Sequence, residues 1–236
     1  MLKTLLSAVV MLVLLAGCST KEKPASKMGK QSWMFQSAPS QQVTILQFGE
    51  EKEYCPNCGM TLSMFYKSNH AATLDGKVKQ YCSIHCVAED LMQGKDVRDI
   101  KVVDVTSLKF VDALSATYVV GSAKKGTMTG ISKYAFASQS DAGDFMHKYG
   151  GEMMGFTEAL EISKKDFSPE VKAKMKAKKM MMAKKGEKVY KMKCTQTTLP
   201  KFNSVSEAKA YISANNICNG LKGKPLQALG IYLFTR

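Results

Sequence analysis

Two close pairs of cysteines constrain the fold of this chain more than any other feature of its sequence. Cys55 and Cys58 are separated by two residues, Cys82 and Cys86 by three, and 23 residues lie between the pairs. Thiolate pairs at this spacing, joined by a segment of β-hairpin length, can converge on one tetrahedral metal ion. Gly59 follows the first pair and permits a tight turn that directs both sulfurs toward one point. The spacing therefore predicts a metal site that ties two segments of the chain together.

The second pair lies in the segment "QYCSIHCVAEDL", residues 80–91. We expect Cys82 to end a strand and Cys86 to lie on the first turn of a helix. A cysteine turn followed by such a strand–helix junction resembles a treble-clef zinc knuckle. The segments "CGM" and "YCS" are more similar still to the TRASH type of heavy-metal domain.

The sequence leaves three states of this cysteine cluster open. Structural Zn²⁺ suits a tetrahedral thiolate site. Cu(I) prefers thiolate and thioether ligands; Met60 directly follows the first pair, and His85, inside the second pair, could replace one cysteine. A disulfide within each pair is the third state, although it would close very small rings. We expect His70 at the start of a strand and at the surface rather than at a metal.

The N-terminus predicts export and lipid attachment. Residues 1–17 hold one lysine, an apolar run too short to cross a bilayer, and a final Leu-Ala-Gly. Leu-Ala-Gly-Cys is the pattern at which bacteria attach a diacylglycerol to the cysteine, here Cys18, and cleave before it. We therefore expect a lipoprotein on the periplasmic side of a bacterial membrane, with Ser19 favouring the outer membrane and residues 18–42 forming a polar tether. An ordinary signal peptide followed by a chance cysteine is the alternative.

Residues 43–162 predict one α+β domain in which the order strand, strand, helix, strand occurs twice. Besides the elements around the cysteines, the expected elements are a strand at 43–48, two strands within 100–122, a glycine-bounded loop and a strand within 126–138, a helix from a Ser/Asp cap to Gly150-Gly151, and a strand at 153–160.

Lysine and methionine dominate residues 163–186, which we expect to form a helical linker. Residues 163–193 hold twelve lysines and three acidic residues, within a formal net charge of +14 for the chain. Because lysine covers every face of the expected helix, we expect no packing in a core. The periplasm argues against nucleic acid as a partner, which leaves anionic lipid, an acidic partner face or a solvated connector. Met175 and Met180–Met182 could bind Cu(I) transiently, or could simply favour the helix.

The tail, residues 187–236, is similar to a small c-type cytochrome. Gly-x3-Tyr-x3-Cys at its start and an apolar segment at its end match the first and last helices of that fold. Covalent haem requires Cys-x2-Cys-His, whereas "TQTT" follows Cys194 and the tail contains no histidine. We therefore expect a small all-α docking module without covalent haem, with a possible disulfide between Cys194 and Cys218.

The segments "CPNCGM", "HAATLDGKVKQYC", "VVDVTS", "TYVVGS", "GTMTGISKYAFAS" and "DAGDFMHKYGGEMMGF", in this order, resemble the NosL family. The similarity covers about residues 50–162, with the lipidation pattern in the expected place. It implies two ββαβ units and a Cu(I) chaperone that serves a periplasmic copper enzyme, nitrous oxide reductase. It also implies that Cys55, Cys58, Met60 and Met128 lie near the copper.

The chain departs from the family pattern in two places. The family loop commonly continues Met-x-His, whereas Gly130 stands at the histidine position after Met128. Other residues would then have to complete the site, or Met128 is structural. Cys82 and Cys86 are two cysteines more than the family pattern requires, and they favour the TRASH-like variant.

Three functional classes follow. The first is a Cu(I) carrier, not an enzyme, and the second is a structural-zinc lipoprotein that docks a periplasmic oxidoreductase. The third is a thiol–disulfide enzyme, which would rest on Cys-x2-Cys without the βαβ context of that motif. The sequence shows no Ser–His–Asp set and no phosphate loop, so hydrolysis is unsupported.

Overall fold

The computed structural model describes residues 34–195 and 197–236. The expected signal peptide, the expected lipidation site at Cys18 and most of the expected tether lie outside these residues. Among the described helices, none is both long enough and apolar enough to cross a membrane.

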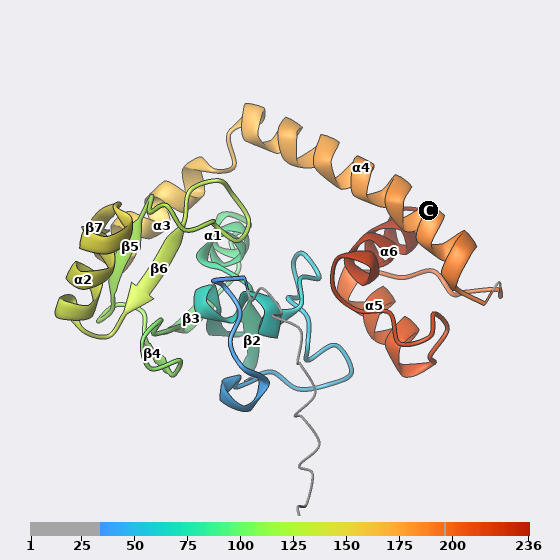
Figure 1. Ribbon diagram of the computed structural model, residues 1–236, viewed down its shortest axis with the longest axis horizontal. Coiled ribbons are helices and arrows are strands. Elements are labelled where there is room, and N and C mark those ends of the chain that lie inside the picture. Colours follow the sequence, from blue (N-terminus) through green and yellow to red (C-terminus); the bar gives the residue numbers. More distant parts are fainter. Residues whose placement is uncertain (1–33, 196) are drawn as a thin grey trace, which may run out of the picture. The chain divides into compact units, whose positions relative to one another are not determined.

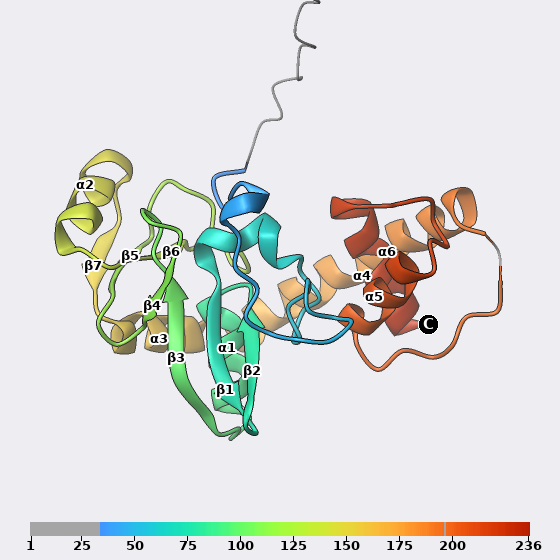
Figure 2. The ribbon, with the colours of Figure 1, turned by 90° about the horizontal axis from the view of Figure 1, so that it is seen from below.

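The first ββαβ unit follows the cysteine turn (Figure 1). Its antiparallel sheet has the strand order β2-β1-β3-β4, and Figure 2 shows β1, β2 and β3 alongside one another. Its elements are β1 (His70–Leu74), β2 (Lys77–Tyr81), α1 (Ile84–Met92) and β3 (Val97–Val103), with β4 (Phe110–Asp112) added at the edge.

The second ββαβ unit repeats this order around a sheet with strand order β6-β5-β7. Its elements are β5 (Thr117–Val120), β6 (Lys133–Phe136), α2 (Gln139–Tyr149) and β7 (Glu152–Met154). The Ser138 side chain caps α2 by accepting a hydrogen bond from Asp141 N, and the helix ends before Gly150. The α+β class and the two units are thereby confirmed.

One hydrophobic core joins the two units. It is formed by residues of α1, β3, β5 and β6 together with α3 (Phe156–Lys165). Its buried members are Ile84, Ala88, Val102, Ala113, Ala116, Tyr118, Val120, Ala135, Phe156, Ala159 and Leu160.

The strand expected at residues 43–48 is wrong. The backbone of this segment bonds to a buried side chain instead of a neighbouring strand. Leu46 N donates to Gln80 Oε1 at 2.8 Å, and Gln80 Nε2 donates to Thr44 O at 3.2 Å. The amide of Gln80 therefore satisfies backbone groups that a strand partner would otherwise bond.

Two further expectations need correction. Residues 100–122 include residues of three strands rather than two, because β4 is inserted between β3 and β5. The strand expected at 153–160 stops at Met154. There the Glu158 carboxylate accepts a hydrogen bond from Gly155 N at 3.2 Å and starts α3.

The lysine-rich segment forms a separate helix, α4 (Pro169–Lys193). Ser168 caps its first turn, and proline at the first helical position suits this start. The C-terminal end of α4 packs closely against α6 (Gly223–Thr235). A Cβ at Gly186 would lie 2.0 Å from Ala228 O, so only glycine permits this approach. The buried residues of α4 are Gly186 and Tyr190, so the helix joins a core only beyond the lysine-rich part for which no core packing was expected.

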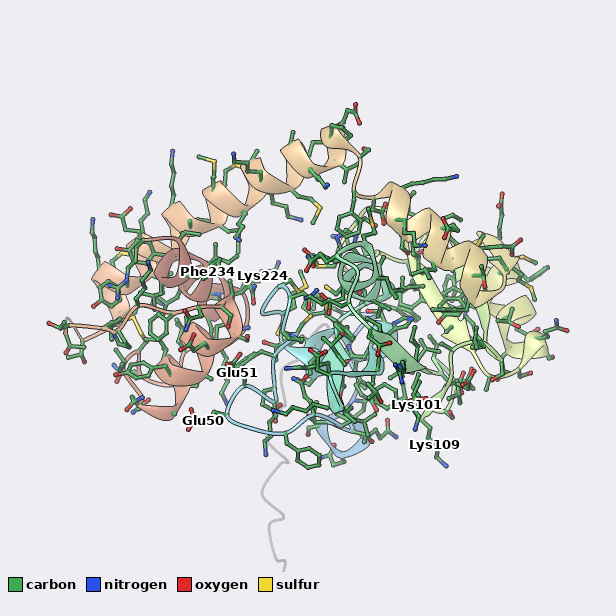
Figure 3. The ribbon with its side chains drawn as sticks, turned by 180° about the vertical axis from the view of Figure 1, so that it is seen from behind. Glu50, Glu51, Lys101, Lys109, Lys224 and Phe234 are labelled. Carbon is green, nitrogen blue, oxygen red and sulfur yellow. A yellow bond between two sulfur atoms is a disulfide. The ribbon has the colours of Figure 1, made fainter. Side chains whose placement is uncertain are left out.

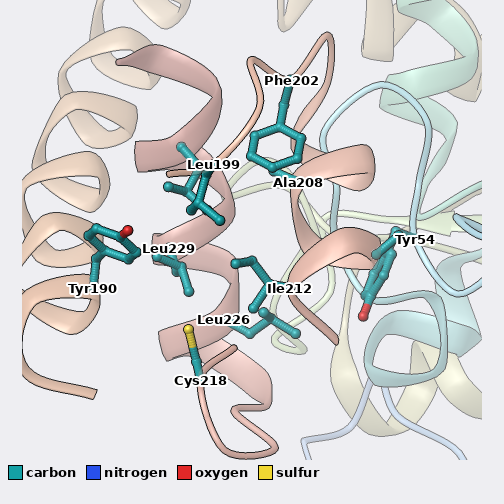
Figure 4. Close-up of a cluster of buried hydrophobic side chains, with 11 residues drawn as sticks. Tyr54, Tyr190, Leu199, Phe202, Ala208, Ile212, Cys218, Leu226 and Leu229 are labelled. Atoms are coloured by element: carbon teal, nitrogen blue, oxygen red, sulfur yellow. The ribbon is translucent and has the colours of Figure 1, made fainter. Parts of the chain in front are cut away.

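The tail consists of the end of α4, α5 (Val205–Ala214) and α6 around a small apolar core (Figure 4). Cys194 and Cys218 form a disulfide with a sulfur–sulfur distance of 2.08 Å. Tyr54, from the segment before the cysteine turn, belongs to the same cluster. Its buried members are Tyr54, Tyr190, Leu199, Phe202, Ala208, Ala210, Ile212, Cys218, Leu226, Leu229 and Leu233.

Candidate metal centre

The first cysteine pair lies on a tight turn closed by backbone hydrogen bonds. Gly59 N donates to Cys55 O, and Cys55 N donates to Met60 O, both at 2.8 Å. Gly59 has a φ of +70°, a left-handed conformation that other L residues rarely adopt. This geometry brings Cys55 and Cys58 to the same side of the turn.

The second pair occupies the junction of β2 and α1. β2 ends at Tyr81 and α1 begins at Ile84, so Cys82 lies in the connection and Cys86 in the first helical turn. The hydroxyl of Ser68 donates to Cys82 O at 2.8 Å and holds this connection in place.

The four cysteine sulfurs converge on one point. All four Sγ atoms lie within 4.8 Å of one another. The Cys58–Cys82 distance is 3.4 Å, and the distances from Cys86 to Cys82 and to Cys58 are both 3.8 Å. A tetrahedron with metal–sulfur bonds of about 2.3 Å has sulfur–sulfur edges of about 3.8 Å. The cluster therefore has the dimensions of a four-thiolate metal cage, and no disulfide forms within either pair.

The cluster is buried unevenly. Cys55, Cys82 and Cys86 are fully buried, whereas Cys58 is partly exposed. Any ligand that enters the cluster from solvent would therefore meet Cys58 first.

The cluster favours one thiolate among its four sulfurs. Burial raises the pKa of the Cys55 thiol, but hydrogen bonds from Cys58, Cys82 and Cys86 outweigh burial and hold that pKa well below its usual value. Hydrogen bonding to Cys55 is also the main reason why the pKa values of Cys82 and Cys86 rise well above the usual range. The four sulfurs thus compete for shared protons. A soft cation that replaces these protons would remove that competition.

Asn57 fastens the first turn to α1. Its Nδ2 donates to Asp90 Oδ1 at 2.8 Å, to Glu89 Oε2 at 3.0 Å and to Cys86 O at 3.2 Å. Sequence reasoning did not identify Asn57, although its place between Cys55 and Cys58 could have marked it.

Two tail residues, which sequence reasoning also missed, bond the backbone of the cysteine turn. Lys209 Nζ donates to Gly59 O at 2.5 Å and to Thr61 Oγ1 at 3.1 Å. It also donates to Gln227 Oε1 at 2.8 Å, while Gln227 Nε2 donates to Cys58 O at 3.0 Å. Burial lowers the pKa of Lys209 to about 7, against the opposing effect of the nearby cysteines. The lysine stands between two alanines of α5, a weak signal of burial.

Met60 and Met128 both pack, partly buried, against the cysteine cluster. The loop that carries Met128 is tied to the first unit, because the hydroxyls of Thr127 and Ser68 lie 2.5 Å apart. Ser68 thus links the Met128 loop to the connection that holds Cys82.

His85 lies outside the sulfur cluster although it stands between Cys82 and Cys86 in sequence. It is 3% exposed, and its ring stacks on Phe167 with 4.3 Å between the ring centroids. Its Nδ1 has no hydrogen-bond partner and lies 3.7 Å from Asp166 Oδ2. Asp166 is itself paired with Lys133 Nζ at 2.8 Å.

The expectation that His70 lies at the surface is wrong. It is 1% exposed, with Nε2 3.0 Å from the Tyr118 hydroxyl and Nδ1 3.1 Å from Ser68 O. Burial lowers the pKa of His70 to about 4. This histidine is a structural part of the core between the two units.

A cavity of about 520 Å³ lies beside the cluster and is called the methionine cavity below. Its lining includes the exposed edge of the cluster and sulfur-bearing residues of α4, and Phe234 on α6, labelled in Figure 3, also borders it. The residues with donor atoms for a soft metal are Cys58, Met60, His85, Met128, Met175 and Met182.

Comparisons with known proteins identify the family that residues 47–167 match. The family model described as NosL matches residues 47–167, about half of the chain. A similar solved structure is titled "Crystal structure of the copper chaperone NosL from Shewanella denitrificans". It shares 25% sequence identity at a TM-score of 0.39, and the match covers 51% of this chain and 96% of that one. A comparison with curated protein sequences gives no match.

Proposed function

Because the chain belongs to the NosL family, we propose that it is a carrier that binds Cu(I) through cysteine and methionine ligands and passes it to a copper enzyme. The uneven burial of the cysteine cluster carries this proposal. Three buried sulfurs shield the ion from water, while the partly exposed Cys58 leaves one side within reach of an incoming ligand. A carrier needs this combination, and it needs no catalytic residue.

Thiolate and thioether are the ligands that Cu(I) prefers, often in sets of only two or three. Met60 and Met128 lie against the cluster and can supply neutral thioethers. Release then proceeds by ligand exchange, in which a sulfur of the receiving protein binds the ion as a sulfur of the carrier leaves. Copper stays Cu(I) throughout, so the transfer requires no electron donor.

We also propose that the protein lies on the periplasmic side of a bacterial membrane, where lipid on Cys18 anchors it. Ser19 favours the outer membrane. The N-terminal sequence pattern supports this location. The recipient we propose is a nitrous oxide reductase-like copper enzyme, as the resemblance to the family implies.

Structural zinc is the second candidate function of the cysteine cluster. It is favoured by one observation, the sulfur–sulfur distances of 3.4–3.8 Å around a nearly closed cage. In that case the cluster would hold the turn and the tail together, and the protein would act as a docking lipoprotein.

Competition for Cu(I) separates these functions. The full chain, with the four cluster thiols free and the Cys194–Cys218 disulfide intact, is titrated without oxygen with Cu(I) against a chromophoric chelator. The carrier predicts a tightly held copper in the cysteine cluster, and this ion is lost in C55S/C58S and retained in M64L. Met64 is a partly buried methionine that packs outside the cluster, which makes M64L a control for general perturbation of the turn. We also expect weaker binding in M60L, since Met60 contacts the cluster.

The opposite result is one zinc ion that Cu(I) does not displace and whose chelation unfolds the domain. That result would overturn the carrier, because a structural zinc contributes folding free energy directly. A transport site instead tolerates the loss of its ion without unfolding.

A further inference from the structure

The methionine cavity joins thioethers from two distant parts of the chain. Met60 and Met128 come from the family domain, and Met175 and Met182 come from α4, which lies beyond the match to the family. All four residues are partly buried. An apolar core does not explain the two α4 residues, because lysine surrounds them in the sequence.

The positions of the methionines on α4 divide them into two sets. Met175 and Met182 are seven residues apart, two helical turns, and therefore lie on the same face. Met180, Met181 and Met192 point elsewhere, being 57%, 59% and 72% exposed and absent from the cavity. Only the first set is placed to contact a ligand in the cavity.

His85 adds a nitrogen donor to the same cavity. Its Nδ1 lies 3.7 Å from the Asp166 carboxylate, too far for a hydrogen bond, and Lys133 holds that carboxylate in place. Histidines that bind metals commonly turn one nitrogen toward a carboxylate, which fixes the ring and leaves the other nitrogen for the metal. In His85 the nitrogen left for a metal is Nε2.

The charge of the cavity selects against hard divalent ions. Its lining carries Lys172, Lys176, Lys178 and Lys179 but only one acidic residue, Glu89. Mg²⁺ and Ca²⁺ require several carboxylate or carbonyl oxygens. Thioethers are neutral, flexible and soft, and they suit a monovalent soft ion.

We propose that Met175, Met182 and His85 form a second Cu(I) site in the methionine cavity, distinct from the cysteine cluster with its neighbours Met60 and Met128. This inference rests on the proposed carrier function and deepens it. The ion moves from the cavity to the cluster when a bond to the Cys58 thiolate forms as a bond to a thioether breaks. Copper remains Cu(I), and a thiol proton, if still present, passes to water.

Copper stoichiometry tests the second site. The full chain should bind two Cu(I) ions, M175L/M182L one and M180L/M181L two. Leucine keeps helix propensity and apolar volume, so the two double variants differ only in which face loses its sulfurs. C55S/C58S should retain the ion in the cavity. Two ions in M175L/M182L, one in the wild type, or equal loss in both double variants would overturn the second site. If the wild-type chain binds no copper at all, the carrier function is overturned as well.

A second measurement does not depend on the variants folding. The wild-type chain is labelled with ¹³C at the methionine methyl groups, and Ag(I) replaces the oxygen-sensitive Cu(I). The methyl resonances of Met175 and Met182 should shift on binding while those of Met180 and Met181 stay unchanged. Unchanged resonances for all four would refute the site, even if copper still binds to the cysteines.

Discussion

At the scale of single residues, Lys209 is a buried lysine that supports the cysteine turn. Its ammonium is 0% exposed, makes hydrogen bonds to Gly59 O, Thr61 and Gln227, and lies 4.1 Å from the centre of the Tyr54 ring. Burial lowers the pKa of Lys209 from 10.5 in the unfolded chain to about 7. The hydrogen bonds of Lys209 therefore stabilise the turn, while removing its charge from water opposes this stabilisation.

This difference in pKa predicts how stability depends on pH. Between about pH 7 and pH 10 the unfolded chain binds a proton at Lys209 that the folded chain has released, so this residue makes unfolding free energy rise with pH. K209M should remove that rise and, by leaving its acceptors unbonded, should lower stability by about 2 kcal/mol at neutral pH. Denaturant unfolding of the metal-free chain, with the Cys194–Cys218 disulfide intact, between pH 6 and pH 9 provides the measurement. K191M, at an exposed lysine, is the control; the same pH slope in K209M and wild type would contradict the prediction.

At the scale of elements, the contact between α4 and α6 depends on one glycine. G186A would place its Cβ 2.0 Å from Ala228 O, a backbone atom that cannot rotate away. The gain of about 1 kcal/mol in helix propensity should be outweighed by overpacking. We expect thermal unfolding of G186A to show a net loss of about 1 kcal/mol or more. G143A is the matched control, because a Cβ at this α2 glycine meets no atom within 4 Å and should stabilise by up to about 1 kcal/mol. Equal behaviour of the two variants would show that the helices do not pack this closely.

Local signals explain which elements could be predicted from the sequence. The serine cap and the glycine stop of α2 act within a few residues, and the cysteine spacing indicated both the turn and the strand–helix junction. The segment 43–48 has strand composition but bonds to the side chain of Gln80, which no pattern of period two reveals. Likewise Lys209 and Gln227 contact residues that lie 150 and 169 positions away. A single sequence offers no signal for contacts at that separation.

At the scale of the whole molecule, the tail and the cysteine turn are parts of one network. Lys209 and Gln227 bond the carbonyl groups of Gly59 and Cys58, and a Cβ at Gly59 would meet Val205 at 2.4 Å. The apolar cluster of the tail includes Tyr54, which directly precedes Cys55. Rigidity of the tail should therefore influence how readily a metal leaves the cluster.

The disulfide provides a test of this coupling. Cys194 and Cys218 are 24 residues apart, and removing a cross-link of that length should destabilise the tail by about 3 kcal/mol. In C194S/C218S the turn loses part of its support, so Cu(I) should pass to a competing chelator faster than from the wild type, as stopped-flow absorbance would measure. C194A/C218A should release Cu(I) as fast as C194S/C218S if the loss of the cross-link, rather than the new hydroxyl groups, causes the faster release. If the tail is destabilised but the rate of copper release is unchanged, the turn keeps its geometry without support from the tail. The hydrogen bonds from Lys209 and Gln227 would then stabilise the tail and would not affect metal binding.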